Sequence, residues 1–545
     1  MSGQKGGPPT VLSEGTQRFR GREAQRMNIM AAVLVADAVK STLGPRGMDK
    51  MLVDSLKDVV VTNDGATILR EIDVDHPIAK MLIEVARAQE TAVGDGTTTA
   101  VVLAGELLKK ADDLLDKDIH PTIIASGYKM AVKEAQKVLQ NLSLDVTLDN
   151  DDILIKVAVT SMTGKGIEDA KDHLAKIAVN TVKSLKSTSD DTITMWDEYI
   201  KIVEREGARI EETELINGVI LEKERVHQSM PSKLKNARLM LANFPLEIND
   251  KELGTQIHID DPNNLRLFLE GRKKATLETI ERITATGANA FFTQKGIDDF
   301  AQYYLAKAGI MAVRRIKKSD LEKLAKATGS NLISNQEELD AGDLGYAGII
   351  EEIRIGNDVV IVIKDCKNPK PVSILLRGET KHIVEETSRS FEDSLGTVAA
   401  VIEDKKIIPG GGAPEIEISK KLHHYAKSIG GREQLAIEAF ADALESIPRT
   451  LAENAGFDVI DKIIELKAQN ERNGPLMGLD VFDGKIKDML DHGVIEPMRV
   501  KKVALDLATQ VAIRILRIDD VIAAAKLKKP SLEEKVAQTG NRSPQ

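Results

Sequence analysis

Residues 94–99, of sequence GDGTTT, combine the residue types that hold a phosphate group, and an apolar helical repeat follows them directly. The first turn of a helix has backbone N–H groups without partners, and glycines let an anion approach them closely. A carboxylate would repel phosphates unless a divalent cation came with them, so Asp95 indicates Mg²⁺ bound with a nucleotide. The alternative is structural, with Asp95 or Thr97 capping the helix, and the spacing does not decide between the two.

Three further segments have similar chemistry: residues 43–47 (LGPRG), 63–67 (NDGAT) and 409–414 (PGGGAP). Each alone is more often an ordinary turn, and only their joint occurrence indicates a site built from several segments. Neither the G-x-x-x-x-G-K-[ST] phosphate loop nor a strand-linked G-x-G-x-x-G is present. The sequence therefore predicts a nucleotide site of another type.

Helical periodicity flanks two of these segments. It predicts one helix over residues 25–40 and a second that begins directly after Gly96. The apolar positions are Met27, Met30, Ala31, Leu34 and Ala38 in the first helix and Val101, Ala104, Leu108, Ala111 and Leu115 in the second.

The middle of the chain follows a different pattern. Short apolar strands at 289–293 and 311–314 enclose a helix at 298–307, which is typical of an α/β module. A further helix after Lys318 has Ser319 and Glu322 at the spacing of a capping box.

Two hairpins are also expected. Strands at 349–355 and 359–363 flank a Gly-Asn-Asp turn, and a shorter hairpin is expected around residues 478–488. From residue 381 the pattern is again mostly helical. The fold class predicted is therefore multi-domain α and α/β, with a helical domain made by both chain ends and an α/β module inserted between them.

Length and composition restrict the class of protein. The 545 residues suggest three or four domains, and 42% hydrophobic with 29% charged residues is typical of a soluble globular chain. The net charge of −10 argues against nucleic acid as a partner. The apolar run at 29–35 is too short to span a membrane, and the N-terminus lacks the features of a secretory signal. A cytoplasmic location is expected.

Two residue types that often carry chemistry are interpreted as structural. Cys366 is the only cysteine, so no disulfide and no Cys-based zinc site can form within the chain, and it is expected to be a buried or half-buried hydrophobe. His423 and His424 are adjacent, and neighbouring helical positions do not face one site.

The glycine and aspartate segments, in their order, resemble the nucleotide-site signatures of chaperonins. The residues that carry the resemblance are 42–50 (TLGPRGMDK), 61–69 (VTNDGATIL), 94–100 (GDGTTTA) and 409–415 (PGGGAPE). Residues 48–50 and 161–166 (SMTGKG) are similar to the group II branch of archaea and the eukaryotic cytosol, whose subunits have a built-in lid. The resemblance covers almost the whole chain.

The resemblance implies three domains. The equatorial ATPase domain comprises residues 1–146 and 406–545, with tails at 1–22 and 529–545. The intermediate domain comprises 147–215 and 370–405. The apical domain comprises 216–369 and includes a helical lid protrusion at about 239–280.

The resemblance also implies roles for single residues. Asp95 is expected to bind Mg²⁺, Asp64 and Asp393 to manage the water that attacks ATP, and Lys165 to sense the γ-phosphate. Because Asp393 lies beyond the inserted module, a domain closure is expected to bring it to the phosphate. The remaining expected nucleotide contacts are Leu43, Gly44, Pro45, Gly96, Thr97, Thr98, Thr99, Gly411, Asp480 and Glu496.

By this resemblance the chain is a subunit of an ATP-driven chaperone with two stacked rings of eight or nine identical or homologous subunits, which encloses unfolded client proteins. Phe268 and Leu269 are candidates for client contact, or for packing within the protrusion or against the lid of a neighbouring subunit. The pairs at 291–292 (FF) and 303–304 (YY) are expected in the core. Two other classes remain open: an ATP-dependent kinase or ligase acting on a metabolite, and a structural ring subunit with little hydrolysis.

Overall fold

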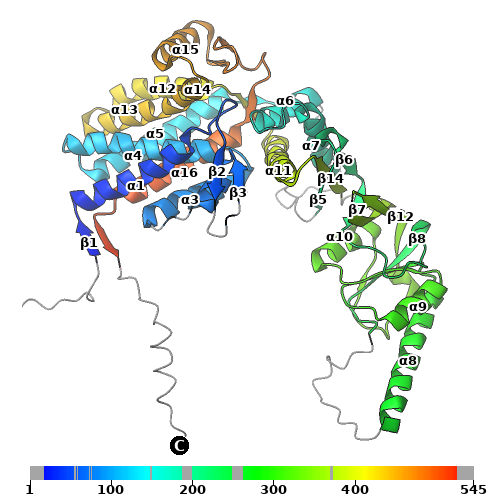
Figure 1. Cartoon of the computed structure of the whole chain (residues 1–545). Helices are drawn as coiled ribbons and strands as arrows, with labels where there is room; N and C mark the ends of the chain where they lie inside the picture. The colour runs from blue at the N-terminus through cyan, green and yellow to red at the C-terminus, as the bar shows by residue number, and fades with distance from the viewer. Residues whose placement is uncertain are drawn as a thin grey trace, which may run out of the picture.

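The computed structural model describes the chain from residue 17 to residue 523, except at 54–56, 58, 73, 75, 148–149, 187–198, 248–261, 357 and 369–371. A helical part lies at one end, an α/β module at the other and a smaller part between them (Figure 1). The side chains of Phe268 and Leu269 lie outside the described part, as do residues 529–545. The predictions made for them therefore stay untested.

The helical part is made by both ends of the chain, as predicted. β1 (Gln17–Arg20) pairs antiparallel with β19 (Asp520–Ala523), so the assignment of residues 17–22 to a tail is wrong. One hydrophobic core joins residues from 29 to 139 with residues from 408 to 516. Its helices are α1 (Arg22–Lys40), α2 (Gly65–Glu71), α3 (Pro77–Val93), α4 (Thr97–Asp116), α5 (Pro121–Leu142), α12 (Ala413–Ile429), α13 (Gly431–Leu444), α14 (Ser446–Asn454) and α16 (Met498–Leu516).

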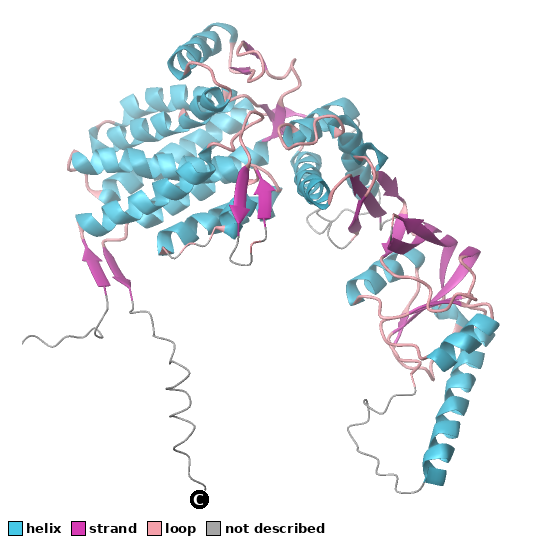
Figure 2. Cartoon of the chain, viewed as in Figure 1, coloured by secondary structure: helices cyan, strands magenta, loops and turns pink. Residues whose placement is uncertain are grey.

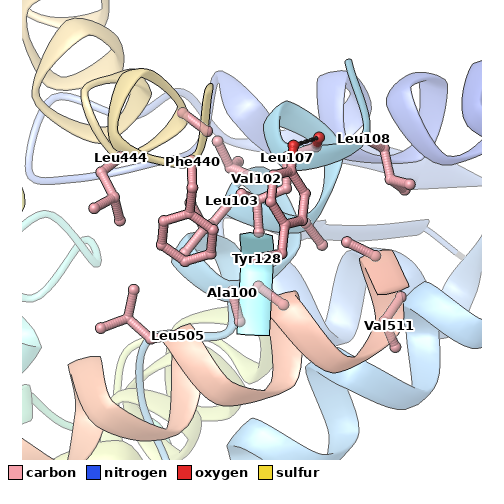
Figure 3. Close-up of a cluster of buried hydrophobic side chains, with 14 of the residues drawn as sticks. Ala100, Val102, Leu103, Leu107, Leu108, Tyr128, Phe440, Leu444, Leu505 and Val511 are labelled. Atoms are coloured by element: carbon pink, nitrogen blue, oxygen red, sulfur yellow. Dashed lines mark hydrogen bonds between the residues drawn. The ribbon is translucent and has the colours of Figure 1, made fainter. Parts of the chain in front are cut away.

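Helix α4 lies at the centre of this core. The predicted stripe of five apolar side chains is buried, and so are half of the residues between them. Tyr128 of α5 donates a hydrogen bond to the Leu107 carbonyl at 2.7 Å and packs edge-on against Phe440 of α13 (Figure 3). The start of α4, and the polar segment before it, are therefore held by a rigid support.

Helix α1 begins three residues before the predicted start and ends at the predicted residue 40, but the apolar positions selected by the helical period do not all face the core. Met30 and Leu34 are 65% and 64% exposed, whereas the core face consists mainly of small residues such as Ala32 and Ala36. A Cβ at Gly105 of α4 would lie 2.4 Å from the Ala36 Cβ, so the two helices meet at a distance that only small side chains allow. The longer side chains of Met27, Met30 and Leu34 consequently lie on the outer face.

A smaller part connects the helical part to the module. It contains α6 (Asp151–Met162), α7 (Lys171–Lys186) and α11 (Lys381–Asp404), with β14 (Val372–Gly378) between β5 (Ile200–Glu206) and β6 (Glu214–Ile216). Its core combines residues that precede the module in sequence with residues that follow it. The chain therefore passes through this part twice.

The module is built on a seven-stranded sheet, where most of the longer strands of the molecule lie (Figure 2). The strand order is β10-β9-β8-β12-β13-β7, and β11 pairs with β8. The strands are β7 (Gly218–Leu221), β8 (Lys233–Ala242), β9 (Ala290–Thr293), β10 (Met311–Val313), β11 (Leu332–Ile333), β12 (Gly345–Ile355) and β13 (Asp358–Cys366). The helices are α8 (Pro262–Ala285), α9 (Asp299–Lys307) and α10 (Lys318–Thr328). Two apolar clusters complete the module.

Most of the elements predicted for the module are confirmed, including β9, α9, β10 and the β12–β13 hairpin. The capping box is wrong. Lys317 is the N-cap of α10, and its carbonyl already accepts from the N–H groups of Asp320 and Leu321, so Ser319 lies inside the first turn.

The two aromatic pairs of the module behave differently. Phe291 and Phe292 are fully buried, as predicted, but Tyr303 is 56% exposed, and the core prediction is wrong for it. Tyr304 is half-buried at the edge of one cluster. Adjacent residues of α9 point in different directions, whereas β9 is covered on both faces. Cys366 is half-buried, as expected. Among the described helices, none has the length and hydropathy needed to cross a membrane.

Candidate functional site

A cavity of about 350 Å³ lies beside the start of α4, where the helical part meets the smaller part. This volume is in the range of small-ligand pockets. All but one of the residues predicted for the site line this cavity, and the exception, Asp393, contacts a lining residue. The predicted lining residues are Leu43, Gly44, Pro45, Asp64, Asp95, Gly96, Thr97, Thr98, Thr99, Lys165, Gly411, Asp480 and Glu496.

The start of α4 has no side-chain cap. Its N-cap is Gly96, in a left-handed conformation with φ 81°, and the Asp95 Oδ1 accepts from the Gly96 N–H at 2.7 Å. Capping by Asp95 or Thr97, the structural alternative, is therefore not what the structure has. The first turn of a 20-residue helix faces the cavity with its positive end.

Asp64 is fixed beside this helix start. Its Oδ2 accepts from the Thr67 N–H at 2.7 Å as the N-cap of α2, and its Oδ1 accepts from the Thr97 hydroxyl at 3.5 Å. A Cβ at Gly65 would lie 2.4 Å from the Thr98 Oγ1 and 3.2 Å from its Cα. The close approach of α2 to α4 therefore requires glycine at this position.

The 43–45 segment is held by a loop from the smaller part. The Asn63 side-chain amide donates to the Gly164 carbonyl at 2.6 Å, and a Cβ at Gly164 would lie 2.6 Å from the Pro45 Cα. Gly164 also has φ 87°, which favours glycine. Lys165 follows directly and is thereby directed into the cavity.

Lys165 and Asp393 form an ion pair within the smaller part, at the edge of the cavity, with 2.5 Å between Nζ and Oδ2 and both side chains 17% exposed. Helix α11 comes this close because a Cβ at Gly396 would lie 2.5 Å from the Val93 carbonyl oxygen. The ion pair holds Asp393 beside the site, but Asp393 does not itself line the cavity, so the expected domain closure stays a prediction.

The electrostatics of this pair follow from burial and from the nearby carboxylates. Burial raises the pKa of Asp393 to about 8; Lys165 opposes the rise, while Asp64 and Asp95 add to it. Burial alone would lower the pKa of Lys165, but the negative charge of Asp393 and Asp95 raises it. Three carboxylates, two of them in the cavity lining, thus lie around the ammonium group of Lys165, a set that favours an additional cation.

The opposite wall comes from the C-terminal half of the chain. Asp480 is buried and accepts from the Phe482 N–H at 2.9 Å and from Lys487 Nζ at 2.6 Å. Burial would raise its pKa, but these hydrogen bonds hold it below the usual range. Gly411 has φ 62°, and its carbonyl accepts from the Leu479 N–H at 2.8 Å. The two segments therefore form a continuous wall, and the predicted hairpin of β16 (Met477–Leu479) and β17 (Ile486–Asp488) is confirmed.

Sequence reasoning missed a buried charged network behind Glu496. Lys501 Nζ lies 2.9 Å from Glu415 Oε1 and 3.2 Å from Glu496 Oε2. Burial raises the pKa of Glu496, with Lys501 opposing the rise. Glu415 stands directly after the glycine segment at 409–414, which was the available signal for its role.

Gln89 was also missed. It is fully buried on α3, and its amide donates to the Asp95 carbonyl at 2.8 Å and to the Val500 carbonyl at 3.1 Å. It follows Leu82 and Val85 on the buried face of α3, so a polar residue within an apolar stripe was the signal. Gln89 ties the Asp95 turn to α16.

The chain is similar to known proteins over almost its whole length. A model of the TCP-1/cpn60 chaperonin family matches residues 35–526. The chain is 55% identical over 529 residues to the thermosome subunit beta of Archaeoglobus fulgidus, covering 97% of each chain. It is 54% identical to the thermosome subunit of Methanopyrus kandleri, covering 95% of each, and 52% identical to that of Pyrococcus horikoshii, covering 98% of this chain and 97% of the relative. The chain therefore belongs to the TCP-1/cpn60 chaperonin family, whose members are ATP-hydrolysing protein-folding chaperones.

Proposed function

We propose that the cavity beside α4 binds and hydrolyses ATP, and that hydrolysis drives closure of a lidded chamber around an unfolded protein. The observation that carries this proposal is the convergence of Asp64, Asp95 and Asp393 with Lys165 beside an uncapped helix start. These residues come from segments far apart in the chain. Positioning and charge balance are what phosphoryl transfer requires from a protein.

The nucleotide would lie with its phosphates against residues 96–99 and its base toward Asp480. Backbone N–H groups and threonine hydroxyls at the start of α4 would donate to phosphate oxygens. Leu43, Gly44 and Pro45 would line one side, and Gly411 with Glu496 would face the ribose.

The residues fit a Mg²⁺ ion. Carboxylate oxygens are the ligands that this ion prefers. Burial raises the pKa of Asp393, and the negative charges of Asp64 and Asp95 add to the rise. Asp95 would hold the ion, which neutralises charge on the phosphates when it is bound.

Asp64 and Asp393 would orient the attacking water and accept its proton. Lys165 would turn from Asp393 toward the γ-phosphate, which frees the carboxylate of Asp393 for the water. Because Lys165 and α11 belong to the smaller part that carries the module, the state of the nucleotide would change how that part sits on the helical part.

The assembly proposed is two stacked rings of eight or nine subunits in the cytoplasm, without membrane or nucleic acid as partners. The domains would follow the boundaries implied by the resemblance, with client protein bound by the apical domain at 216–369. Apolar side chains on the outer face of α1 and on the hairpin of β2 (Lys50–Val53) and β3 (Val59–Thr62) are suited to contacts between subunits. These exposed side chains are Met27, Met30, Leu34, Met51, Val53, Val59 and Val61, together with Met48 in the loop before β2.

The test is electron microscopy of the purified protein with and without ATP and Mg²⁺, together with refolding of a denatured client. Stacked rings whose ends close with ATP, and client recovery that depends on hydrolysis, are expected. Rings that stay open under turnover, or turnover that requires a metabolite, would contradict the proposal.

A further inference from the structure

A second cavity, of about 480 Å³, lies among α1, α4, α13, α14 and α15 (Val459–Asn473) of the helical part. All nine residues that line it are charged or, in one case, a serine. None of them lines the nucleotide cavity. Five are cationic: Lys40, Lys109, Lys110, Arg449 and Lys467.

These cations exceed the carboxylates of the cavity. Three acidic side chains line it, Glu106, Asp442 and Glu445, and the lining residue Lys40 pairs with Glu453 outside the cavity at 3.3 Å, which leaves a surplus of one positive charge. Glu445 is buried and already paired, with Lys467 Nζ at 2.6 Å and Arg449 NH2 at 3.0 Å.

The two lysines of α4 are the least neutralised. Lys109 Nζ is 3.9 Å from Glu106, at the limit of an ion pair, and Lys110 makes no ion pair within 4.0 Å among the residues that the structure describes. Their charge is therefore available to a ligand.

A buried hydroxyl in the same cavity also lacks a partner. Ser446 is 7% exposed, lines the cavity and makes no hydrogen bond through its Oγ within the described part of the chain. It stands at the first position of α14, whose start has no side-chain cap. Buried hydroxyls normally have a partner, so the group is placed to donate to a bound oxygen atom.

The sign of the charges decides the class of ligand. His423, Asp442 and Glu445 offer ligand atoms within 4.8 Å of one another, which could suggest a metal ion. The ammonium of Lys467 and the guanidinium of Arg449 already occupy the Glu445 carboxylate and would repel a second cation. An anion that carries several oxygens satisfies the lysines, the arginine and the hydroxyl together.

The second cavity lies back to back with the nucleotide cavity. Helix α14 supplies Ser446 and Arg449 to the second cavity and Ile447 and Leu451 to the first. The Asn454 side chain at the end of α14 donates to the Lys40 carbonyl at 3.2 Å and to the Leu43 carbonyl at 2.9 Å. A displacement of α14 is therefore transmitted to both sites.

We infer that this cavity binds a small multivalent oxyanion of the phosphate class, and that the bound anion alters nucleotide affinity through α14 and the 40–45 segment. The binding step stands on the second cavity alone, whereas the coupling rests on the proposed nucleotide site. Because linkage is reciprocal, the nucleotide must change the anion affinity by the same factor.

The binding test is calorimetric titration of the full-length assembled protein with pyrophosphate at low salt, after saturation with ADP. Lys109→Gln combined with Lys110→Gln removes the two least neutralised positive charges of the cavity. Neither substitution leaves a buried carboxylate without its partner. Lys129→Gln combined with Lys133→Gln on α5 is the matched control, because both lysines are exposed and the loss of charge is equal. Thermal unfolding checks that both double variants fold.

The expected result is one pyrophosphate per chain in the wild type and in the control, with about tenfold weaker binding in the Lys109/Lys110 variant. Equal binding in both variants, or no binding in the millimolar range, would overturn the inference. Loss of binding on ADP saturation would do so too, because the pyrophosphate would then have been in the nucleotide cavity.

The coupling test measures ADP affinity with and without pyrophosphate. A change of about threefold in the wild type, absent in the Lys109/Lys110 variant, is expected. An unchanged ADP affinity would refute the coupling. If the protein bound pyrophosphate through Lys109 and Lys110 but did not bind ADP, the anion site would be supported and the proposed nucleotide site refuted. Failure of the anion site and failure of the nucleotide site therefore give different results.

Discussion

The helical part and the α/β module differ in the kind of polar side chain that they bury. Around the cavity beside α4, charged side chains such as Glu415, Asp480 and Lys501 are buried, whereas the buried polar residues described within 216–369 are threonines, a glutamine and a serine. Burying ionised groups is costly unless they are paired or serve a ligand. The comparison indicates that the helical part is arranged for a charged ligand and that the module has an ordinary core, suited to move as a unit.

The largest effect is expected from Asp393→Asn. The amide cannot accept a proton from water, so turnover of ATP should fall about 10³-fold, while nucleotide affinity should stay within about threefold. Glu385→Gln, on the exposed side of the same helix, is the control and should be neutral. A variant with normal turnover would remove Asp393 from the chemistry and leave a purely structural ion pair.

In the module, Phe292→Ala should destabilise the local fold by about 3–5 kcal/mol, because a fully buried ring is lost. ATP turnover should survive if the module unfolds as a separate unit. Calorimetry should show one transition moved to lower temperature and the other unchanged, with the exposed Tyr303→Ala as control. A uniform shift of both transitions would contradict the separation of the two regions.

Two glycine substitutions sharpen the same comparison. Gly65→Ala places a methyl group against Thr98 and should weaken nucleotide binding about tenfold, since α2 and α4 must separate. Gly271→Ala on α8 meets no atom within 4 Å and should be neutral or stabilising by up to about 1 kcal/mol. Fluorescent-nucleotide titration and thermal unfolding measure both effects. Equal behaviour of the two variants would refute the tight packing at the site.

The smallest effect is a shift in pH dependence. With the pKa of Asp393 raised to about 8, the fraction of carboxylate in the free protein increases with pH up to that value. The kcat/KM for ATP should therefore rise at most tenfold per pH unit below 8 and level off above it. Lys165 opposes the rise in pKa, so Lys165→Gln should move the limb to higher pH. If the rising part of the pH profile moved to lower pH in this variant, or stayed in place, the account in which Lys165 lowers the pKa of Asp393 would be contradicted.

Sequence reasoning predicted more of the helical site than of the surfaces. The glycine and aspartate segments predicted the lining of the cavity because close backbone approach and charge need particular residue types, as at Gly65 and Asp95. Met30 and Leu34 on the outward face of α1 were assigned to its apolar stripe because they follow the same helical period as core residues do. The pairing of Lys501 with Glu415 was missed since 86 residues separate them, and only the fold brings them together.

The central claim is that these distant segments enclose one Mg-bound triphosphate. Its most direct test is an experimental structure of the assembled protein with ADP, aluminium fluoride and Mg²⁺. The account predicts the nucleotide in the cavity beside α4, the metal on Asp95, and a water between Asp393 and the γ-phosphate mimic. A nucleotide bound elsewhere, or one whose γ position is beyond reach of both Asp64 and Asp393, would contradict it.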